Sequence, residues 1–257
     1  MSRAFPALGL LKGYRLEPND VLPDVGAFER IDRFPARVLF WNPAAETWAK
    51  HRNPLLAPEI GVSIDTFAID TLHTLNLGVF QKFLARAWWA LLQGDAFGVA
   101  GEAGGRRNVE ELVANGLGPL KVALWKFYKA FEEANPKVKV NRLEALTLNT
   151  LGPRDSCSLN TQAAETRPLL RFTAELLAEK QAFLKPEDGA LLPAGQALAD
   201  FSDALRELPE TVTVQQAARP VGLLKRYVSL AAAAKVPATP KLHLAMHLVQ
   251  RTGISKK

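Results

Sequence analysis

The sequence predicts a mainly α fold with a small β component. After about residue 70, apolar residues recur at spacings of three and four, the pattern of helices that bury one face. One segment, residues 61–70, instead alternates apolar and polar residues, which is typical of a half-buried strand. The 257 residues are 48% apolar and 23% charged, so the chain can bury a sizeable core and has the composition of a globular protein.

The first sixty residues are rich in proline and aromatic residues and show no clear periodicity. Residues 37–41 (RVLFW) predict a short strand, and residues 42–54 are expected to hold one or two helical turns before Pro54. We therefore expect an irregular N-terminal segment with a short strand, residues 1–60, followed by one larger domain, residues 61–257.

The first long helix follows residue 70 and is expected to end near Gly94, a common helix stop. Its apolar residues form one broad stripe at helical spacing: Phe80, Phe83, Leu84, Ala87, Trp88, Leu91 and Leu92. The glycine-rich segment 98–108 then predicts a flexible linker, because it lacks the Gly-Lys-Ser/Thr ending of a phosphate-binding loop. Further helices are expected at residues 108–115, 119–134, 140–148, 193–207, 213–233 and 240–251.

Pro168 bears on where the helix in residues 163–183 begins. Proline is tolerated in the first turn of a helix and is disruptive further in, so we expect the regular helix to start near Thr166 or to be kinked there. In either case Glu165 lies at or near a helix N-terminus, where the helix dipole favours its negative charge.

The overall charge and the single cysteine limit the classes of function. A net charge of +6 permits a polyanionic partner such as nucleic acid, although modest basicity also serves solubility. One cysteine, Cys157, excludes an internal disulfide and indicates a reducing compartment, the nucleus or the cytoplasm. The sequence shows no secretory signal and no apolar run of about 18 residues, so no membrane association is expected.

Asp70 and His73 form the first candidate site, at the point where the predicted strand turns into the first long helix. An Asp at a helix start can accept hydrogen bonds from backbone N–H groups, and its carboxylate can also reach an imidazole three residues later. The pair is therefore either a helix cap with a satisfied histidine, which is the simpler interpretation, or part of a functional site.

His243 and His247 are further candidates, because a spacing of four places both imidazoles on one helical face. Two histidines can begin a zinc site, but zinc needs further ligands, and the intervening Glu of a metalloprotease motif is absent. Core or capping histidines are the simpler interpretation. Glu165 taken alone is likewise typical of a charge matched to a helix dipole, and Cys157 of a plain loop thiol.

Two segments combine basic and aromatic residues, namely 124–131 (LWKFYKAF) and 223–230 (LLKRYVSL). They are either nucleic-acid contacts or, as is more common, amphipathic helices whose lysines are solvated.

Three segments together resemble the CACTA-type cut-and-paste DNA transposases. Residues 70–84 (DTLHTLNLGVFQKFL) are similar to the Asp-x-x-His segment of that family, and residues 163–172 (AAETRPLLRF) to the later segment in which a Glu opens a helix. Residues 240–249 (PKLHLAMHLV) are similar to a Pro-Lys-x-His-x-x-x-His-Leu stretch near the end of such cores. Their order and rough spacing agree with the family.

This resemblance implies a ribonuclease-H-like α/β core with a helical insertion, here residues 98–150. In that family three acidic residues hold two divalent ions, usually Mg²⁺, which carry out an in-line phosphoryl displacement. Glu165 then corresponds to the third acid, and Asp65 is the candidate for a second catalytic, metal-binding acid. Asp70 and His73 would support the site and stabilise the fold.

The segment before residue 61 is too short for the several strands that such a sheet needs, and it holds no recognisable first acid. We therefore expect a truncated or degenerate core derived from a transposase, which binds DNA and uses Mg²⁺ only if it is catalytic. The alternative is a helical interaction module without chemistry. The sequence carries no signal for an oligomeric state.

Overall fold

The computed structural model describes residues 37–42, 47–52, 70–100, 108–209 and 212–252. The chain divides into two compact units, Met1–Ala68 and Ile69–Lys257. The break therefore lies eight residues after the position expected from the sequence.

A two-stranded antiparallel hairpin is the described part of the first unit. Strand β1 (Arg37–Asn42) pairs with β2 (Thr47–Arg52), and Trp41 lies opposite Trp48. The short strand predicted at residues 37–41 is confirmed. The helical turns expected in residues 42–54 are wrong, because six residues of this segment form β2 and pair with β1. The strand predicted at 61–70 lies outside the described residues, except for Asp70.

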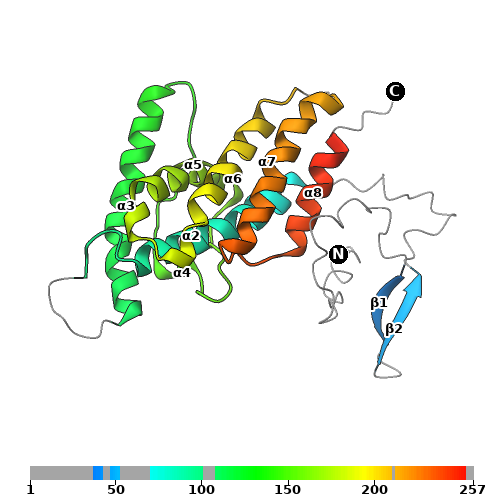
Figure 1. The fold of residues 1–257 in the computed structure, drawn as a ribbon, viewed down its shortest axis with the longest axis horizontal. Helices are drawn as coiled ribbons and strands as arrows, with labels where there is room; N and C mark the ends of the chain where they lie inside the picture. The colour runs from blue at the N-terminus through cyan, green and yellow to red at the C-terminus, as the bar shows by residue number, and fades with distance from the viewer. Residues whose placement is uncertain (1–36, 43–46, 53–69, 101–107, 210–211, 253–257) are drawn as a thin grey trace, which may run out of the picture. The chain divides into compact units, whose positions relative to one another are not determined.

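The regular elements described in the second unit are all helices, which confirms a mainly α fold (Figure 1). No ribonuclease-H-like sheet is present in residues 70–100, 108–209 and 212–252. The long elements are the π-helix η5 (Leu72–Phe80) and the α-helices α2 (Gln81–Gln93), α3 (Val109–Ala134), α5 (Ala163–Glu179), α6 (Leu191–Arg206), α7 (Val214–Ala233) and α8 (Pro240–Thr252). The short elements are α4 (Leu148–Leu151), η6 (Gln181–Phe183) and η7 (Pro186–Asp188).

Helix α2 forms the centre of the core. Figure 1 shows it with η5 as a cyan helix that runs across the helical unit. All seven residues of the predicted apolar stripe are buried, as expected. Trp88 donates a hydrogen bond from Nε1 to Thr173 Oγ1 of α5 at 2.9 Å, so its one polar atom is satisfied inside the core.

The contacts of Phe83 show how α2 is enclosed by helices that come much later in the chain. Its ring meets that of Tyr227 on α7 edge-on, with centroids 6.1 Å apart. Gly195 on α6 allows a close approach, because a Cβ atom there would lie 2.8 Å from Phe83 Cζ. One turn further along α2, Arg86 forms a largely buried ion pair with Asp188 of η7. The α2 helix thus connects most of the unit.

Helix α3 is longer than predicted, since the two expected helices are one continuous element. The break was expected at residues 116–118, but Gly116 packs against Leu92 of α2 and Leu120 is fully buried. Packing on both sides of Pro119 therefore outweighs its low helix propensity and the loss of one hydrogen bond.

The helix expected at residues 140–148 is wrong. The chain is irregular there, and only the four-residue α4 follows, capped by Thr147. Leu143 and Leu146 are buried at a spacing of three, which imitates a helical pattern. The Leu143 N–H, however, donates to Tyr128 Oη at 3.1 Å, so α3 and not a local helix satisfies it.

Helix α5 begins at Ala163, three residues before the expected start, and contains Pro168 in its second turn. Proline removes the hydrogen bond to the carbonyl of Ala164. Ala164 is exposed, so water can satisfy that carbonyl, which makes the proline tolerable at this position. The other three late helices agree with the prediction within two residues at each end.

Candidate functional site: the π-helix junction

The three sequence segments that resemble transposases meet around η5. We call this region the π-helix junction and define it as residues 70–81 together with the first turns of α5 and α8. In the contact pattern of the unit, η5 packs against α2, α5 and α8. π-Helical turns are rare and occur often at functional sites, so this junction is the candidate functional site.

Asp70 caps the start of the π-helix. Its Oδ1 accepts hydrogen bonds from the backbone N–H groups of Leu72 at 2.8 Å and His73 at 3.3 Å. Its Oδ2 pairs with His73 Nδ1, and both side chains are exposed. The hydrogen bond from His73, supported by the two backbone N–H groups, lowers the pKa of the Asp70 carboxyl. This arrangement confirms the predicted cap and the predicted Asp–His contact.

Two amides connect η5 and α2 to the chain that leads into α5. Asn76 Nδ2 donates to the carbonyl of Ala163 at 3.0 Å, and Gln81 Nε2 donates to the carbonyl of Thr161 at 2.8 Å. Sequence analysis assigned neither residue a role. The sequence nevertheless indicates that Asn76 and Gln81 form specific hydrogen bonds, because both are polar residues within a mostly apolar helical stretch. Such residues must find partners when they are half-buried.

Lys241 connects α8 to the same π-helix. Its Nζ donates to the carbonyl of Leu77 at 2.7 Å, and its aliphatic chain crosses Gly78. A Cβ atom on Gly78 would lie 2.5 Å from Lys241 Cδ, so only glycine permits this crossing. Burial, together with the nearby charge of Lys82, lowers the pKa of Lys241. The Leu-Gly of the first motif and the Pro-Lys of the last thus form one contact.

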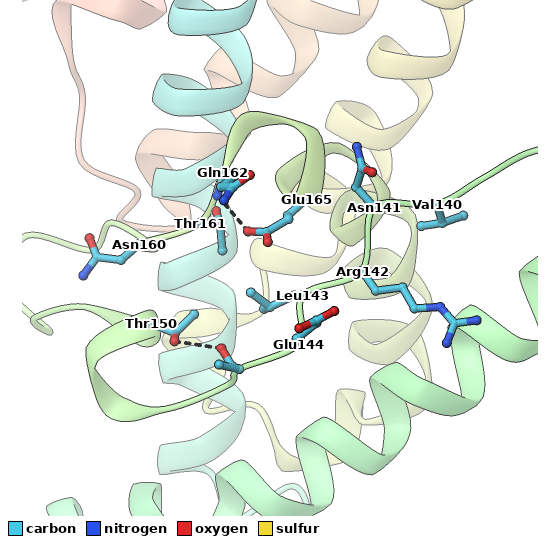
Figure 2. A pocket seen from close by; sticks show the side chains of 11 residues that line it. Val140, Asn141, Arg142, Leu143, Glu144, Thr150, Asn160, Thr161, Gln162 and Glu165 are labelled. Atoms are coloured by element: carbon cyan, nitrogen blue, oxygen red, sulfur yellow. Dashed lines mark hydrogen bonds between the residues drawn. The ribbon is translucent and has the colours of Figure 1, made fainter.

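Glu165 lies in the first turn of α5, as predicted, where it closes a capping box. Its Oε2 accepts a hydrogen bond from the Gln162 backbone N–H at 2.8 Å (Figure 2). The side chain also borders an open pocket of about 950 Å³ between the start of α5 and residues 140–145. Burial of the phenol raises the pKa of Tyr128, and the negative charge of the nearby Glu165 raises it further.

The polar groups of this pocket do not converge on one point. Figure 2 shows Arg142 extending away from Glu165 toward α3, where its Nε donates to Glu132 Oε1 at 3.0 Å. Glu144 also lines the pocket, but its carboxylate makes no hydrogen bond with Glu165 in the described structure. The pocket therefore contains carboxylates without the arrangement of a metal centre.

The remaining predicted site residues are Asp65, His243 and His247. Asp65 lies outside the described residues. His243 lies on α8 and is exposed, while partial burial lowers its pKa. His247 lies on the same helix, as predicted, but its side chain is not among those described. In the described part of the chain, no group of three His, Cys, Asp or Glu side chains could hold a metal ion.

Cys157 does not belong to the junction. It is buried in the loop before α5, and its Sγ lies 2.8 Å from the carbonyl oxygen of Arg154. Burial raises the pKa of the thiol, so the reactive thiolate is disfavoured. The interpretation as a plain loop thiol is consistent with this environment.

Comparison with known proteins found no matching family model, no matching curated protein and no matching solved structure. Of the helices in the described part of the chain, none has the length and apolar character needed to cross a bilayer. The interpretation of the junction therefore depends on its own geometry.

Proposed function

We propose that this chain is a DNA-binding domain derived from the core of a CACTA-type transposase. One observation supports the proposal above the others. The three motifs of the resemblance are far apart in the sequence, yet side-chain hydrogen bonds join them: Asn76 to Ala163 and Lys241 to Leu77. Short motifs that match a family by chance have no reason to meet in space.

In this proposal the π-helix junction has a structural role. Asp70 and Glu165 both act as helix caps, and Asn76 and Lys241 bind carbonyl groups of neighbouring elements. The described residues do not fit a Mg²⁺ centre, which requires several converging oxygen ligands. We therefore assign no chemical step to the described residues, and the role of Glu165 as a metal ligand stays a prediction.

DNA binding is supported by charge. The chain has a net charge of +6, and the basic residues of both predicted nucleic-acid segments are exposed on α3 and α7. Cations on a helical surface neutralise phosphates and release bound counterions, which gives salt-dependent binding. We expect the protein to bind a fluorescent DNA oligonucleotide, with an affinity that falls steeply as salt is added. Fluorescence anisotropy over a series of salt concentrations measures this, and absence of binding at low salt would contradict the proposal.

Two substitutions of Glu165 separate a catalytic carboxylate from a capping one. Glu165→Gln keeps an oxygen that can accept the Gln162 N–H but removes the charge that a metal ion needs, whereas Glu165→Ala removes both. If Glu165 is a cap only, Glu165→Gln retains stability, and Glu165→Ala loses about 0.5–2 kcal/mol of unfolding free energy. Glu175→Gln, on the exposed face of the same helix, is the control.

Nicking of supercoiled plasmid DNA with Mg²⁺ is the second readout for these variants. Our proposal predicts no nicking that depends on Glu165. Nicking by the native protein that disappears equally in Glu165→Gln and Glu165→Ala, but persists in Glu175→Gln, would instead identify Glu165 as a catalytic acid.

The alternative function, a helical interaction module without DNA binding, has one observation in its favour. The conspicuous acidic residues of the described motifs, Asp70 and Glu165, are already occupied by backbone N–H groups. The same anisotropy experiment separates the two functions, because an interaction module has no reason to bind an oligonucleotide.

A further inference from the structure

Helix α3 exposes an indole ring on its outer face. Figure 1 shows α3, in green, at one edge of the helical unit. Its inner face buries Leu120, Leu124 and Tyr128, whereas Trp125 is 47% exposed and Val122 56% exposed. A single exposed aromatic side chain is ordinary on a protein surface, so the charges that surround Trp125 decide what its ring can bind.

Lysines surround this indole. Lys121 and Lys129 stand four residues before and after Trp125, and therefore on the same side of the helix, about 12 Å apart along its axis. Lys126 is adjacent and, like Lys129, exposed. The only acid that pairs with these lysines in the described structure is Glu133, whose Oε1 lies 3.9 Å from Lys129 Nζ between two well-exposed side chains. Three lysines outnumber this one carboxylate, so the face keeps a net positive charge.

We infer that this face of α3, consisting of Lys121, Val122, Trp125, Lys126 and Lys129, binds a single-stranded nucleic acid by stacking an unpaired base on Trp125. The inference deepens the proposed function and rests on it. Lysines at this spacing neutralise phosphates, while the exposed indole offers a flat apolar surface to a base. A duplex hides the faces of its bases, so it can use the lysines but not the ring.

The second basic segment lacks the feature that carries this inference. On α7, Lys225 and Arg226 are exposed, but the neighbouring Tyr227 is buried against Phe83. That surface can therefore attract phosphates without stacking on bases, which makes it a matched control. A membrane is a poorer fit to α3, because interfacial helices present a wide apolar face, whereas the face around Trp125 has only two exposed large apolar side chains, Val122 and Trp125.

The test compares the binding of a labelled oligo(dT) strand with that of a labelled duplex by fluorescence anisotropy, using the full chain. Trp125→Ala should weaken binding of the single strand by roughly 5- to 150-fold and leave the duplex almost unchanged. Trp125→Phe should restore much of the affinity, since it keeps an aromatic face. Replacing Lys121, Lys126 and Lys129 by Gln should reduce the salt dependence for both ligands. The control Lys225→Gln/Arg226→Gln should preserve the preference for the single strand.

Three results would overturn the inference. If Trp125→Ala binds the single strand as tightly as the native protein, this face of α3 does not stack on a base, and the proposed DNA binding is not contradicted. If the native protein binds neither oligonucleotide at low salt, the proposed function fails together with the inference. If Trp125 is instead required for binding to vesicles of phosphatidylcholine and phosphatidylserine, and not for oligo(dT), the face is a membrane contact. Circular dichroism of each variant confirms that the helices remain folded.

Discussion

At the scale of single residues, the π-helix junction depends on the absence of a side chain at Gly78. Lys241 lies across this glycine. Its ammonium group donates a hydrogen bond to the Leu77 carbonyl oxygen, while its methylene groups cover the helix. The sequence contained both residues within quoted motifs, but no local pattern links positions that are 163 residues apart. The contact became visible only with the fold.

Gly78→Ala should therefore destabilise the protein. The new methyl group would lie 2.5 Å from Lys241 Cδ and 3.2 Å from the His73 carbonyl oxygen, so the lysine has to move. Overpacking of this kind costs about 1–3 kcal/mol, which urea unfolding measures. Gly222→Ala is the control, because a Cβ atom on that helical glycine of α7 meets nothing within 4 Å and should be neutral or stabilising.

A double-mutant cycle with Lys241→Ala tests the cause. If Lys241 is the group that the methyl displaces, Gly78→Ala should cost much less in the Lys241→Ala background. Equal costs in both backgrounds would show that the glycine serves another purpose.

The Asp70 cap should make stability depend on acid pH. Its pKa is lower in the folded protein than in the unfolded chain, because His73 and two backbone N–H groups favour the carboxylate. The stabilisation is therefore present above the ordinary Asp pKa of about 3.9 and is lost as the pH falls through the lower folded value. The urea midpoint of Asp70→Asn should lie below that of the native protein near pH 7, and the gap should narrow as the pH falls below about 3.9.

Asp155→Asn removes one exposed loop carboxylate and controls for the change in net charge. A gap between native protein and Asp70→Asn that stays constant down to acid pH would mean that the carboxylate charge does not stabilise the cap.

At the scale of elements, sequence patterns located helices well and their junctions poorly. Every residue of the predicted apolar stripe is buried, because apolar residues at helical spacing share one face of the helix, although Ala85 and Ala90 of α2 are buried as well. The single helix α3 was predicted as two, since Gly116 and Pro119 are local breakers whose effect is overcome by packing against Leu92. The false helix at residues 140–148 arose from the spacing of its buried leucines.

In the candidate site, likewise, local features were predicted and non-local contacts were not. The cap by Asp70 and the position of Glu165 at a helix start follow from local rules, and both were predicted. The hydrogen-bond partners of Asn76 and Lys241 are distant in the sequence, so neither secondary-structure propensity nor hydrophobic periodicity predicts them. The π-helical form of η5 was also not foreseen, because its sequence has the same apolar spacing as an α-helix.

Asn76→Ala tests whether η5 and α5 depend on each other. The substitution removes the amide hydrogen bond to the carbonyl of Ala163, and the loss of one hydrogen bond costs about 0.5–1.5 kcal/mol. We expect faster hydrogen exchange in the first turns of α5, together with a lower urea midpoint. Asn115→Ala, at an exposed position of α3, should have little effect. Equal stability of both variants would show that the amide bond does not hold the two elements together.

At the scale of the whole molecule, the core of the helical unit is covered by helices of the same unit. The buried face of α2 is covered by α3 and α5, and Phe83 reaches Gly195 of α6 and Tyr227 of α7, all within Ile69–Lys257. The first and last helices of this unit also meet, because Lys241 of α8 binds Leu77 of η5. Contacts between the two ends of a unit make its unfolding cooperative.

We therefore expect a fragment of residues 69–257 to fold without the N-terminal unit. Its unfolding free energy should agree with that of the same transition in the full chain within about 1 kcal/mol, because independent units contribute additively. Circular dichroism during urea unfolding measures both. A fragment of residues 69–179 is the control, since it keeps η5, α2, α3 and α5 but removes α6, α7 and α8, and Phe83 then loses its cover. That shorter fragment should unfold without a sharp transition. If the longer fragment also loses its cooperative transition, the N-terminal unit completes the core of the helical unit, and the division of the chain at residue 68 does not mark independent folding.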